Sequence, residues 1–368
     1  MRAVPTVLLL AASTLGLAQV SDVEHLFDRA MEEQQRRDFP DAIRDYQNVL
    51  QLSPKLIDAR VNLGAALSQA GRFDEAIVQY RLALSVMPDN DAVRRNLGLA
   101  YYKKGDLAAA TGEFEEVRKR KPADPSLAVL LADSEVRSGK AEDALAMLGP
   151  LEAANQTNPD FEYVMGTALI ASGRRRDGVA RLEKVAETTQ NVDAYYLAGS
   201  TLLDLNEGEA ARRNLEAALR LNPGLPHIYT MVGLARDRSG EPGDAAVAFR
   251  EAARQDPSDF DANLYLGAIL TKQRKLEEAR PHLDKALTLR PDSTFARYEL
   301  ALWKSTSGQY DAAVTDLETI VKADPTWLEP HVELATVYYR LHRTEEGKQQ
   351  REIVARLTEQ QQTRGPGK

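Results

Sequence analysis

The chain contains no cysteine, and this absence removes several kinds of chemistry. Disulfides, thiolate metal ligands, cysteine nucleophiles and a lipid-modified cysteine are all excluded. Aromatic residues are also scarce, at 6% of the 368 residues, whereas alanine and leucine are abundant. This composition favours long helices packed on small side chains over strands.

Positive charge is outweighed by negative charge. The chain has 47 lysines and arginines against 55 aspartates and glutamates, a formal net charge of −8. Nucleic-acid binding is therefore not expected. One basic run, at residues 118–121, follows three glutamates at the end of a predicted helix, where cations complement the helix dipole. We interpret it as a solvated helix end.

Catalytic and metal-binding motifs are missing as well. None of the five histidines pairs with another at the three- or four-residue spacing that would direct two imidazoles at one ion. His331 and His342 fall in different predicted helices and are interpreted as surface residues. The chain has no HExxH, GxSxG, phosphate-binding glycine loop or EF-hand loop. We therefore expect a protein without catalytic activity, metal or cofactor.

Long hydrophobic runs are limited to the N-terminus. Arg2 precedes an apolar stretch and a small-x-small motif that ends at Ala18, a pattern typical of a signal peptide. Cleavage after Ala18 would make Gln19 the first mature residue. The alternative is an uncleaved anchor, but the stretch is short for a membrane span of about 20 apolar residues. No other segment is apolar enough to cross a membrane, so we expect no stable insertion after cleavage.

What the sequence does contain is a repeat. Residues 62–64 read Asn-Leu-Gly, and residues 96–98, 34 positions later, read the same. When Ile57 is taken as the first position of a repeat, the eighth and twentieth positions are always glycine or alanine. The eighth positions are Ala30, Gly64, Gly98, Ala132, Gly166, Gly199, Gly233, Gly267, Ala301 and Ala335. The twentieth are Ala42, Ala76, Ala110, Ala144, Gly178, Ala211, Ala245, Ala279, Ala313 and Gly347.

These residue types suit a stack of antiparallel helix pairs. Small side chains at both positions let two helices approach closely, and a large apolar residue four positions after the second fills the seam. Glycine recurs at the turn between the paired helices, where a left-handed backbone is needed. A proline closes most repeats and ends the second helix. One pair cannot bury its apolar faces alone, so the repeats are expected to stack around a continuous core.

The pattern resembles the tetratricopeptide repeat (TPR). In the third repeat, Leu97-Gly98, Tyr101, Ala110, Phe114 and Pro122 match the spacing L-G-x2-Y, A-x3-F and P of that family. The resemblance implies an all-α, right-handed superhelical solenoid. Its leading tryptophan is replaced, for example by Arg60 and Arg94. We assign residues 1–18 to the signal peptide, 19–22 to a linker, 23–357 to ten repeats starting near 23, 57, 91, 125, 159, 192, 226, 260, 294 and 328, and 358–368 to a polar tail.

Repeats four and five are the least regular. Gly149-Pro150 falls inside the second predicted helix of repeat four and should break it early. Repeat five is one residue short, and Gln156 and Gln190 replace the closing prolines. This irregularity has two alternative explanations. Either the solenoid tolerates sequence drift in these repeats, or they form a bend that alters the curvature of a groove. Pro281 also lies within a second helix, but near its start, where it costs less.

The resemblance places the binding surface on the first helices, which line the concave face in TPR proteins. The fifth, sixth, ninth and twelfth positions of each repeat would face inward, and tyrosine there suits recognition because it combines apolar area with a polar tip. Packing between neighbouring first helices is the alternative role for these residues. The candidate groove residues are Phe27, Asn62, Asn96, Tyr102, Tyr163, Tyr196, Tyr265, Tyr298 and Tyr339.

The function expected from these features is that of an exported, non-catalytic scaffold or adaptor that binds protein segments, with the bacterial periplasm or cell envelope as its location. No lysine occupies the groove positions that clamp a C-terminal carboxylate in TPR co-chaperones, so that type of binding is not expected. A substrate-recruiting or regulatory subunit of a separately encoded envelope protease or glycosyltransferase is the alternative. Self-association through the repeats is a third.

Overall fold

The computed structural model describes residues 22–122 and 124–364. The predicted signal peptide, with its cleavage site between Ala18 and Gln19, lies outside the described residues. Within them the chain is helical and contains no strand. This confirms the predicted all-α fold.

The chain divides into two compact units, and the division falls between Arg181 and Leu182. This point lies inside α11 (Arg175–Thr189), in the shortened repeat five. The N-terminal unit begins with a helix at residues 22–35. Its other elements are α2 (Phe39–Leu52), α3 (Ile57–Gln69), α4 (Phe73–Val86), α5 (Asp91–Lys104), α6 (Leu107–Arg118), α7 (Pro125–Arg137), α8 (Ala141–Leu148), η1 (Gly149–Leu151), α9 (Glu152–Asn155) and α10 (Pro159–Ala171).

The C-terminal unit continues the alternation of first and second helices. Its elements are α12 (Val192–Asp204), α13 (Gly208–Leu221), α14 (Ile228–Arg238), α15 (Pro242–Gln255), α16 (Phe260–Lys272), α17 (Leu276–Leu289), α18 (Thr294–Thr306), α19 (Tyr310–Ala323), α20 (Leu328–Arg340) and α21 (Thr344–Arg364). The first helix of repeat seven begins at Ile228 rather than near 226, because Pro226 is followed by His227 in a left-handed conformation with φ of 58°.

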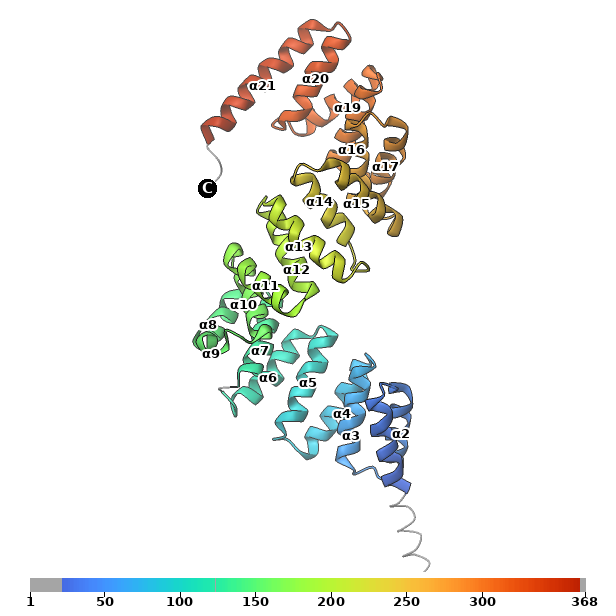
Figure 1. Ribbon diagram of the computed structural model, residues 1–368, viewed down its shortest axis with the longest axis vertical. Coiled ribbons are helices and arrows are strands. Elements are labelled where there is room, and N and C mark those ends of the chain that lie inside the picture. Colours follow the sequence, from blue (N-terminus) through green and yellow to red (C-terminus); the bar gives the residue numbers. More distant parts are fainter. Residues whose placement is uncertain (1–21, 123, 365–368) are drawn as a thin grey trace, which may run out of the picture. The chain divides into compact units, whose positions relative to one another are not determined.

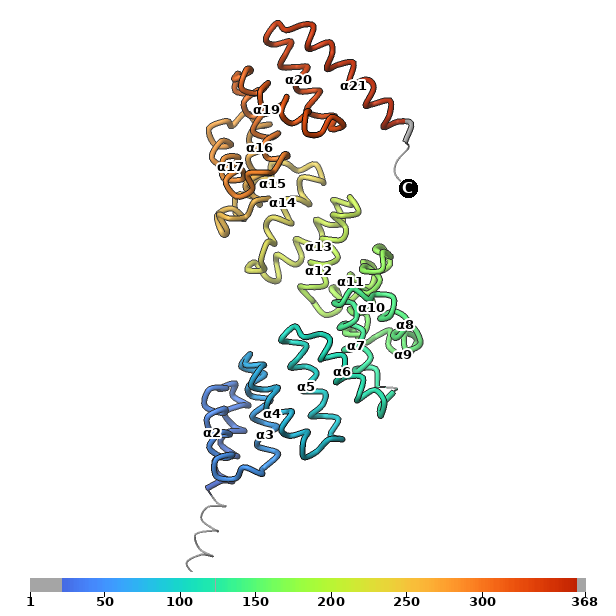
Figure 2. The backbone as a smooth tube through the Cα atoms, turned by 180° about the vertical axis from the view of Figure 1, so that it is seen from behind, coloured from blue at the N-terminus to red at the C-terminus, as the bar shows by residue number. Residues whose placement is uncertain are grey.

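Within each unit the helix pairs stack in chain order (Figures 1 and 2). Most helices contact the next along the chain, as in α3 with α4 and α4 with α5, whereas α10 contacts α7 and α8. First helices also contact the first helix of the following repeat, as α14 does with α16. The first helices therefore form a continuous row in each unit.

The seam between paired helices is as narrow as the small residues imply. A Cβ added to Gly98 would lie 2.5 Å from Cε1 of Phe114, and one added to Gly64 would lie 2.7 Å from Cε1 of Tyr80. Phe114 is fully buried and Tyr80 is 2% exposed. A glycine on the first helix thus accepts the aromatic ring of the second helix directly against its backbone.

The turn between paired helices has the same geometry in every repeat. The six predicted turn glycines all have positive φ, from 76° at Gly71 to 91° at Gly105. The remaining four repeats adopt the left-handed conformation without glycine, and their turn residues are Arg37, Asn206, Arg274 and His342. A left-handed residue costs about 1–2 kcal/mol when it carries a side chain, so the surrounding helix packing fixes these four turns.

A polar clasp takes the place of the family's leading tryptophan. In repeat three, Arg94 donates to the carbonyl of Pro88 at 2.8 Å and forms an ion pair with Glu113 at 2.8 Å. The side chain thereby ties the start of its own first helix to the end of the preceding repeat and to its own second helix. The other fourth-position residues that reach back to the closing proline carbonyl are Arg60, Asn263, Arg297 and His331.

The clasp corrects the interpretation of His331 as a surface residue. His331 is 4% exposed, and its ring nitrogens lie 3.2 Å from the carbonyl oxygen of Pro325 and 2.6 Å from Oε1 of Gln350. His331 is covered by the closing turn of the preceding repeat and by Gln350 on α21, contacts that a search for catalytic spacing cannot detect.

Repeat four breaks where glycine and proline predict it. Helix α8 ends at Leu148 and the chain passes through the 3-10 turn η1 into the short α9. Pro281, by contrast, is accommodated within the continuous α17. Its position in the early turns of the helix limits the loss of hydrogen bonding.

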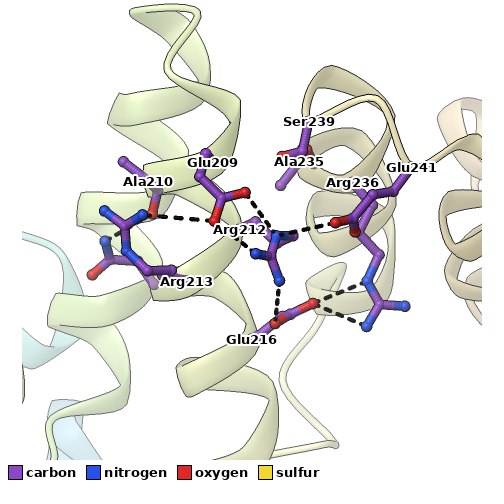
Figure 3. Close-up of polar contacts among 10 residues, drawn as sticks. Glu209, Ala210, Arg212, Arg213, Glu216, Ala235, Arg236, Ser239 and Glu241 are labelled. Atoms are coloured by element: carbon purple, nitrogen blue, oxygen red, sulfur yellow. Dashed lines mark hydrogen bonds and ion pairs between the residues drawn. The ribbon is translucent and has the colours of Figure 1, made fainter.

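Surface ion pairs reinforce the contact between repeats six and seven (Figure 3). Arg212 on α13 contacts Glu209 at 2.7 Å and Glu216 at 3.3 Å, and Glu216 also accepts from Arg236 on α14 at 2.9 Å. Arg212 also forms an ion pair with Glu241, in the turn before α15, with 3.9 Å between the charged atoms. Since positive and negative groups neutralise one another within this network, it offers no site for a polyanion.

Candidate functional site

In the N-terminal unit, the candidate groove residues lie on first helices and are partly exposed. Phe27 packs edge-to-face on Tyr46, with 5.8 Å between ring centroids. Asn62 forms a hydrogen bond with the Tyr46 hydroxyl, and Tyr163 packs beside the core of repeats four and five. These side chains therefore have packing roles, whereas Asn96 is a partly exposed residue of α5.

Tyr102 joins two successive first helices. Its hydroxyl donates to Asp133 on α7, and the guanidinium of Arg137 lies 4.5 Å above its ring. Burial, followed by the neighbouring carboxylate of Asp133, raises the pKa of Tyr102. The arrangement shows that first helices of this chain can hold a cation against a tyrosine ring.

In the C-terminal unit, Tyr196 lines a pocket of about 470 Å³ among α12, α14 and α16. Its wall combines apolar side chains, Met231 and Leu234 among them, with Asp261 and Arg290. The guanidinium of Arg290 lies 4.1 Å from the ring centroid of Phe260. Burial raises the pKa of Asp261, so this carboxylate is poorly solvated.

The same pocket contains His227, Thr230 and Asp259, residue types that occur together in hydrolases. Here Asp259 accepts from the Thr230 hydroxyl at 2.6 Å and from the amide of Ala262 at 2.9 Å, which makes it the N-cap of α16. Nδ1 of His227 is 3.5 Å from the same carboxylate. Thr230 is 4% exposed and its proton points to the aspartate rather than to the histidine, so the group positions a loop and contains no activated nucleophile.

A row of aromatic side chains follows the first helices of repeats eight to ten. Tyr265 on α16 lies 6.4 Å from Phe295, Phe295 lies 6.2 Å from Trp327, and Trp327 lies 5.0 Å from Tyr298, all between ring centroids. We call Tyr265, Phe295, Tyr298 and Trp327 the aromatic strip. Phe295 is 41% exposed and the other three are partly exposed. The strip thus presents a continuous apolar surface at the solvent boundary.

Glu299, next to Tyr298 on α18, is a buried acidic residue beside this strip. It is 5% exposed, and its Oε2 has no hydrogen-bond partner among the described residues. Burial raises the pKa of Glu299, and Lys272 opposes that shift through space. The charge of Glu299 in turn contributes to raised pKa values of both Tyr265 and Tyr298, although burial is the larger cause for each.

Two of the predicted tyrosines, Tyr265 and Tyr298, therefore belong to one surface. Tyr196 lines the pocket described above, and Tyr339 belongs to neither the pocket nor the aromatic strip. The ring of Tyr339 packs against Gly347 on α21, where an added Cβ would lie 3.0 Å from Cζ of the tyrosine.

Three residues in or beside the aromatic strip were not among the groove residues predicted from the sequence. Glu299 occupies a sixth position, one of those predicted to face inward, but it is neither aromatic nor an amide. Phe295 lies at a second position and Trp327 directly before α20, and neither position was among those predicted. Including second positions and the residue before each first helix would have found both.

Neither a metal centre nor a membrane span is found in the part of the chain that the structure describes. No cluster of three or more histidine, aspartate or glutamate side chains there could hold a metal ion. The helices described also lack the combination of length and hydrophobicity that a bilayer span requires.

Comparisons with curated proteins find partial relatives. The chain is 30% identical over 142 residues to Superkiller protein 3 of Saccharomyces cerevisiae, a match that covers 39% of this chain and 9% of that protein. It is 30% identical over 170 residues to anaphase-promoting complex subunit 7 of Dictyostelium discoideum, covering 42% of this chain and 29% of the relative. The matched region thus spans less than a third of these relatives.

Comparison with solved structures gives further matches of low identity. The crystal structure of MamA shares 24% identity, covers 44% of this chain and 95% of its own, and has a TM-score of 0.41. The hetero-tetramer Cut9-Hcn1 shares 14% identity, covers 91% of this chain and 76% of its own, and has a TM-score of 0.45.

Family profiles described as tetratricopeptide repeat match most of the array. One matches residues 27–85, 163–226 and 230–294, just over half of the chain. Two others match residues 66–105 and 102–168. Together with the paired helices, the glycine seam and the left-handed turns, these matches show that the chain belongs to the tetratricopeptide repeat family.

Proposed function

We propose that this protein is a non-catalytic scaffold or adaptor that binds extended protein segments on the first helices of its C-terminal unit. TPR proteins are generally protein-interaction scaffolds. The observation that carries the proposal is the aromatic strip, because partly exposed aromatic side chains in contact with one another are typical of interaction surfaces and are rarely left open to water. The pocket at Tyr196 adds a depression on the first helices of the same unit.

The proposal is tested by photo-crosslinking in cells. A photoreactive amino acid at Phe295 should give covalent adducts with partner proteins, because this side chain is exposed at the centre of the strip. The matched control is the same amino acid at Val247 on the second helix α15, which is 58% exposed and apolar but lies outside the strip. Adducts at Val247 alone, or equal adducts at both positions, would refute the proposed surface.

We further propose export to the cell envelope, supported by the signal-like sequence before Gln19. The mature protein purified from its native cells is expected to begin at Gln19, because signal peptidase cleaves after a small-x-small motif. Mass spectrometry of the intact protein measures this directly. A mass that includes Met1 or Arg2 would contradict cleavage, and recovery of that longer form from the membrane fraction would support an uncleaved anchor.

A further inference from the structure

The geometry points to a lysine or arginine side chain as the group that the aromatic strip recognises, held against its rings and attracted by the nearby charge of Glu299. This inference rests on the proposed binding of protein segments and names the chemistry of the segment. It is carried by two independent features, the ring arrangement and the orphaned carboxylate oxygen.

The rings are placed as a cation requires. The face of an aromatic ring carries partial negative charge, and an ammonium or guanidinium within about 6 Å of its centroid is attracted to it. Centroids in the strip are separated by 5.0 to 6.4 Å, so a single side chain inserted along it can touch more than one ring. The alkyl part of lysine or arginine would cover the apolar surface at the same time.

Glu299 supplies the missing counter-charge. A buried carboxylate oxygen without a donor is costly, and such groups are usually paired. Oε2 of Glu299 has no donor, although Tyr265 and Tyr298 feel its charge. Oε2 is itself closed to solvent, so a cation on the strip would be attracted to this carboxylate through space rather than bonded to Oε2.

The surrounding charge has the sign that attracts a cation. Glu329 and Glu333 act on Tyr298 in addition to Glu299, and Asp237 and Asp261 act on Tyr265. Arg238 opposes them at Tyr265, and Lys272 opposes them at Glu299. Among the charged groups that act on Tyr265, Tyr298 and Glu299, acidic ones therefore outnumber basic ones.

The same unit already contains an internal example of this contact. Arg290 lies 4.1 Å from the ring centroid of Phe260 at the first turn of α16. It is the C-cap residue of α17 and its guanidinium is engaged with Phe260, so it is not the ligand of the strip. It shows that aromatic rings on these first helices accept a cation in the folded chain.

The test uses two peptides and the two indole signals of the full chain. An acetylated and amidated glycine–serine peptide with one central lysine is compared with the same peptide carrying norleucine, which keeps the alkyl chain and lacks the charge. Trp327 reports on the strip. Trp303, whose indole donates to the carbonyl of Leu276 at 2.9 Å under Arg280, is the internal reference.

The lysine peptide should shift the Trp327 indole signal in nuclear magnetic resonance spectra and leave that of Trp303 unchanged. Glu299→Gln should weaken the affinity about tenfold, since it removes a poorly solvated negative charge beside the rings. Glu345→Gln removes the same charge from an exposed site on α21 and should leave the affinity unchanged. Circular dichroism confirms that both variants are folded.

Two results would overturn the inference. If the norleucine peptide binds as tightly as the lysine peptide and Glu299→Gln has no effect, the strip is a general apolar surface and the proposed function stands. If neither peptide shifts Trp327, the cation site is wrong, and crosslinking from position 295 then decides separately whether the strip binds protein.

Discussion

Phe114→Ala is expected to lower the free energy of unfolding of the N-terminal unit by about 3–5 kcal/mol. The ring is fully buried and lies against the backbone of Gly98, so its removal leaves a cavity in the seam between α5 and α6. Gly98→Ala should cost about 1–3 kcal/mol for the opposite reason, overpacking, because the new methyl group would meet the ring at 2.5 Å. Hydrogen exchange of the amides in α5 and α6 measures both effects locally, which suits an array that need not unfold in one step.

The two positions should also be coupled. Elsewhere in the chain the same positions hold alanine with leucine, as in Ala132 with Leu148. The double variant Gly98→Ala with Phe114→Leu should therefore be more stable than the sum of its single variants predicts. Gly112→Ala is the control, since it lies in α6 with open space around its Cα and should be neutral or stabilising. Additive effects of the pair would contradict direct contact across the seam.

Glu299→Gln is expected to stabilise the C-terminal unit at neutral pH by about 1–3 kcal/mol, because it removes a buried negative charge whose Oε2 has no hydrogen-bond partner among the described residues. The pKa of Glu299 is raised in the folded chain, so the folded state holds its proton more tightly than the unfolded state. In the wild type, this residue's contribution to stability therefore falls as pH rises through the window from the unfolded pKa to the raised folded pKa. The advantage of glutamine should be absent below about pH 3, where Glu299 is protonated in both states, and present at about pH 8.

Thermal unfolding of the two proteins at a series of pH values measures this difference. This measurement distinguishes a carboxylate that stabilises the fold from one that binds a ligand. Neutralising a carboxylate that stabilises the fold should lower the stability of the chain. A variant that is less stable than the wild type at pH 8 would show that Glu299 has an internal partner. A difference that does not change with pH would exclude ionisation as its cause.

The seam and the turns could be predicted because each rests on contacts within one repeat. Glycine and alanine at fixed spacing, an aromatic or leucine four residues later and glycine at the turn determine a helix pair locally. Four turns lack glycine, for instance at Arg274, and there the conformation follows from packing on both sides. The end of α8 before Gly149-Pro150 could also be predicted, because glycine and proline disrupt the helix in which they occur.

The contacts between repeats were the part that sequence could not supply. His331 was expected at the surface and is buried, because the closing turn of the preceding repeat contacts it in addition to Gln350 on α21. The strip has the same origin, since Trp327 precedes one first helix and packs on Phe295 and Tyr298 of another. Such residues cannot be recognised by their spacing within a repeat, and the cost of burying Glu299 appears only when the neighbours are in place.

The polar clasp makes the array unequal along its length. Where a fourth-position side chain such as Arg94 holds the closing proline of the preceding repeat, separating two repeats breaks hydrogen bonds as well as apolar contacts. Repeat four has Ala128 at this position, and a methyl group cannot hold the preceding turn. At that junction a hydrogen bond between repeats instead runs from Tyr102 to Asp133, so a pulling force would meet a different set of polar contacts at each junction rather than a uniform spring.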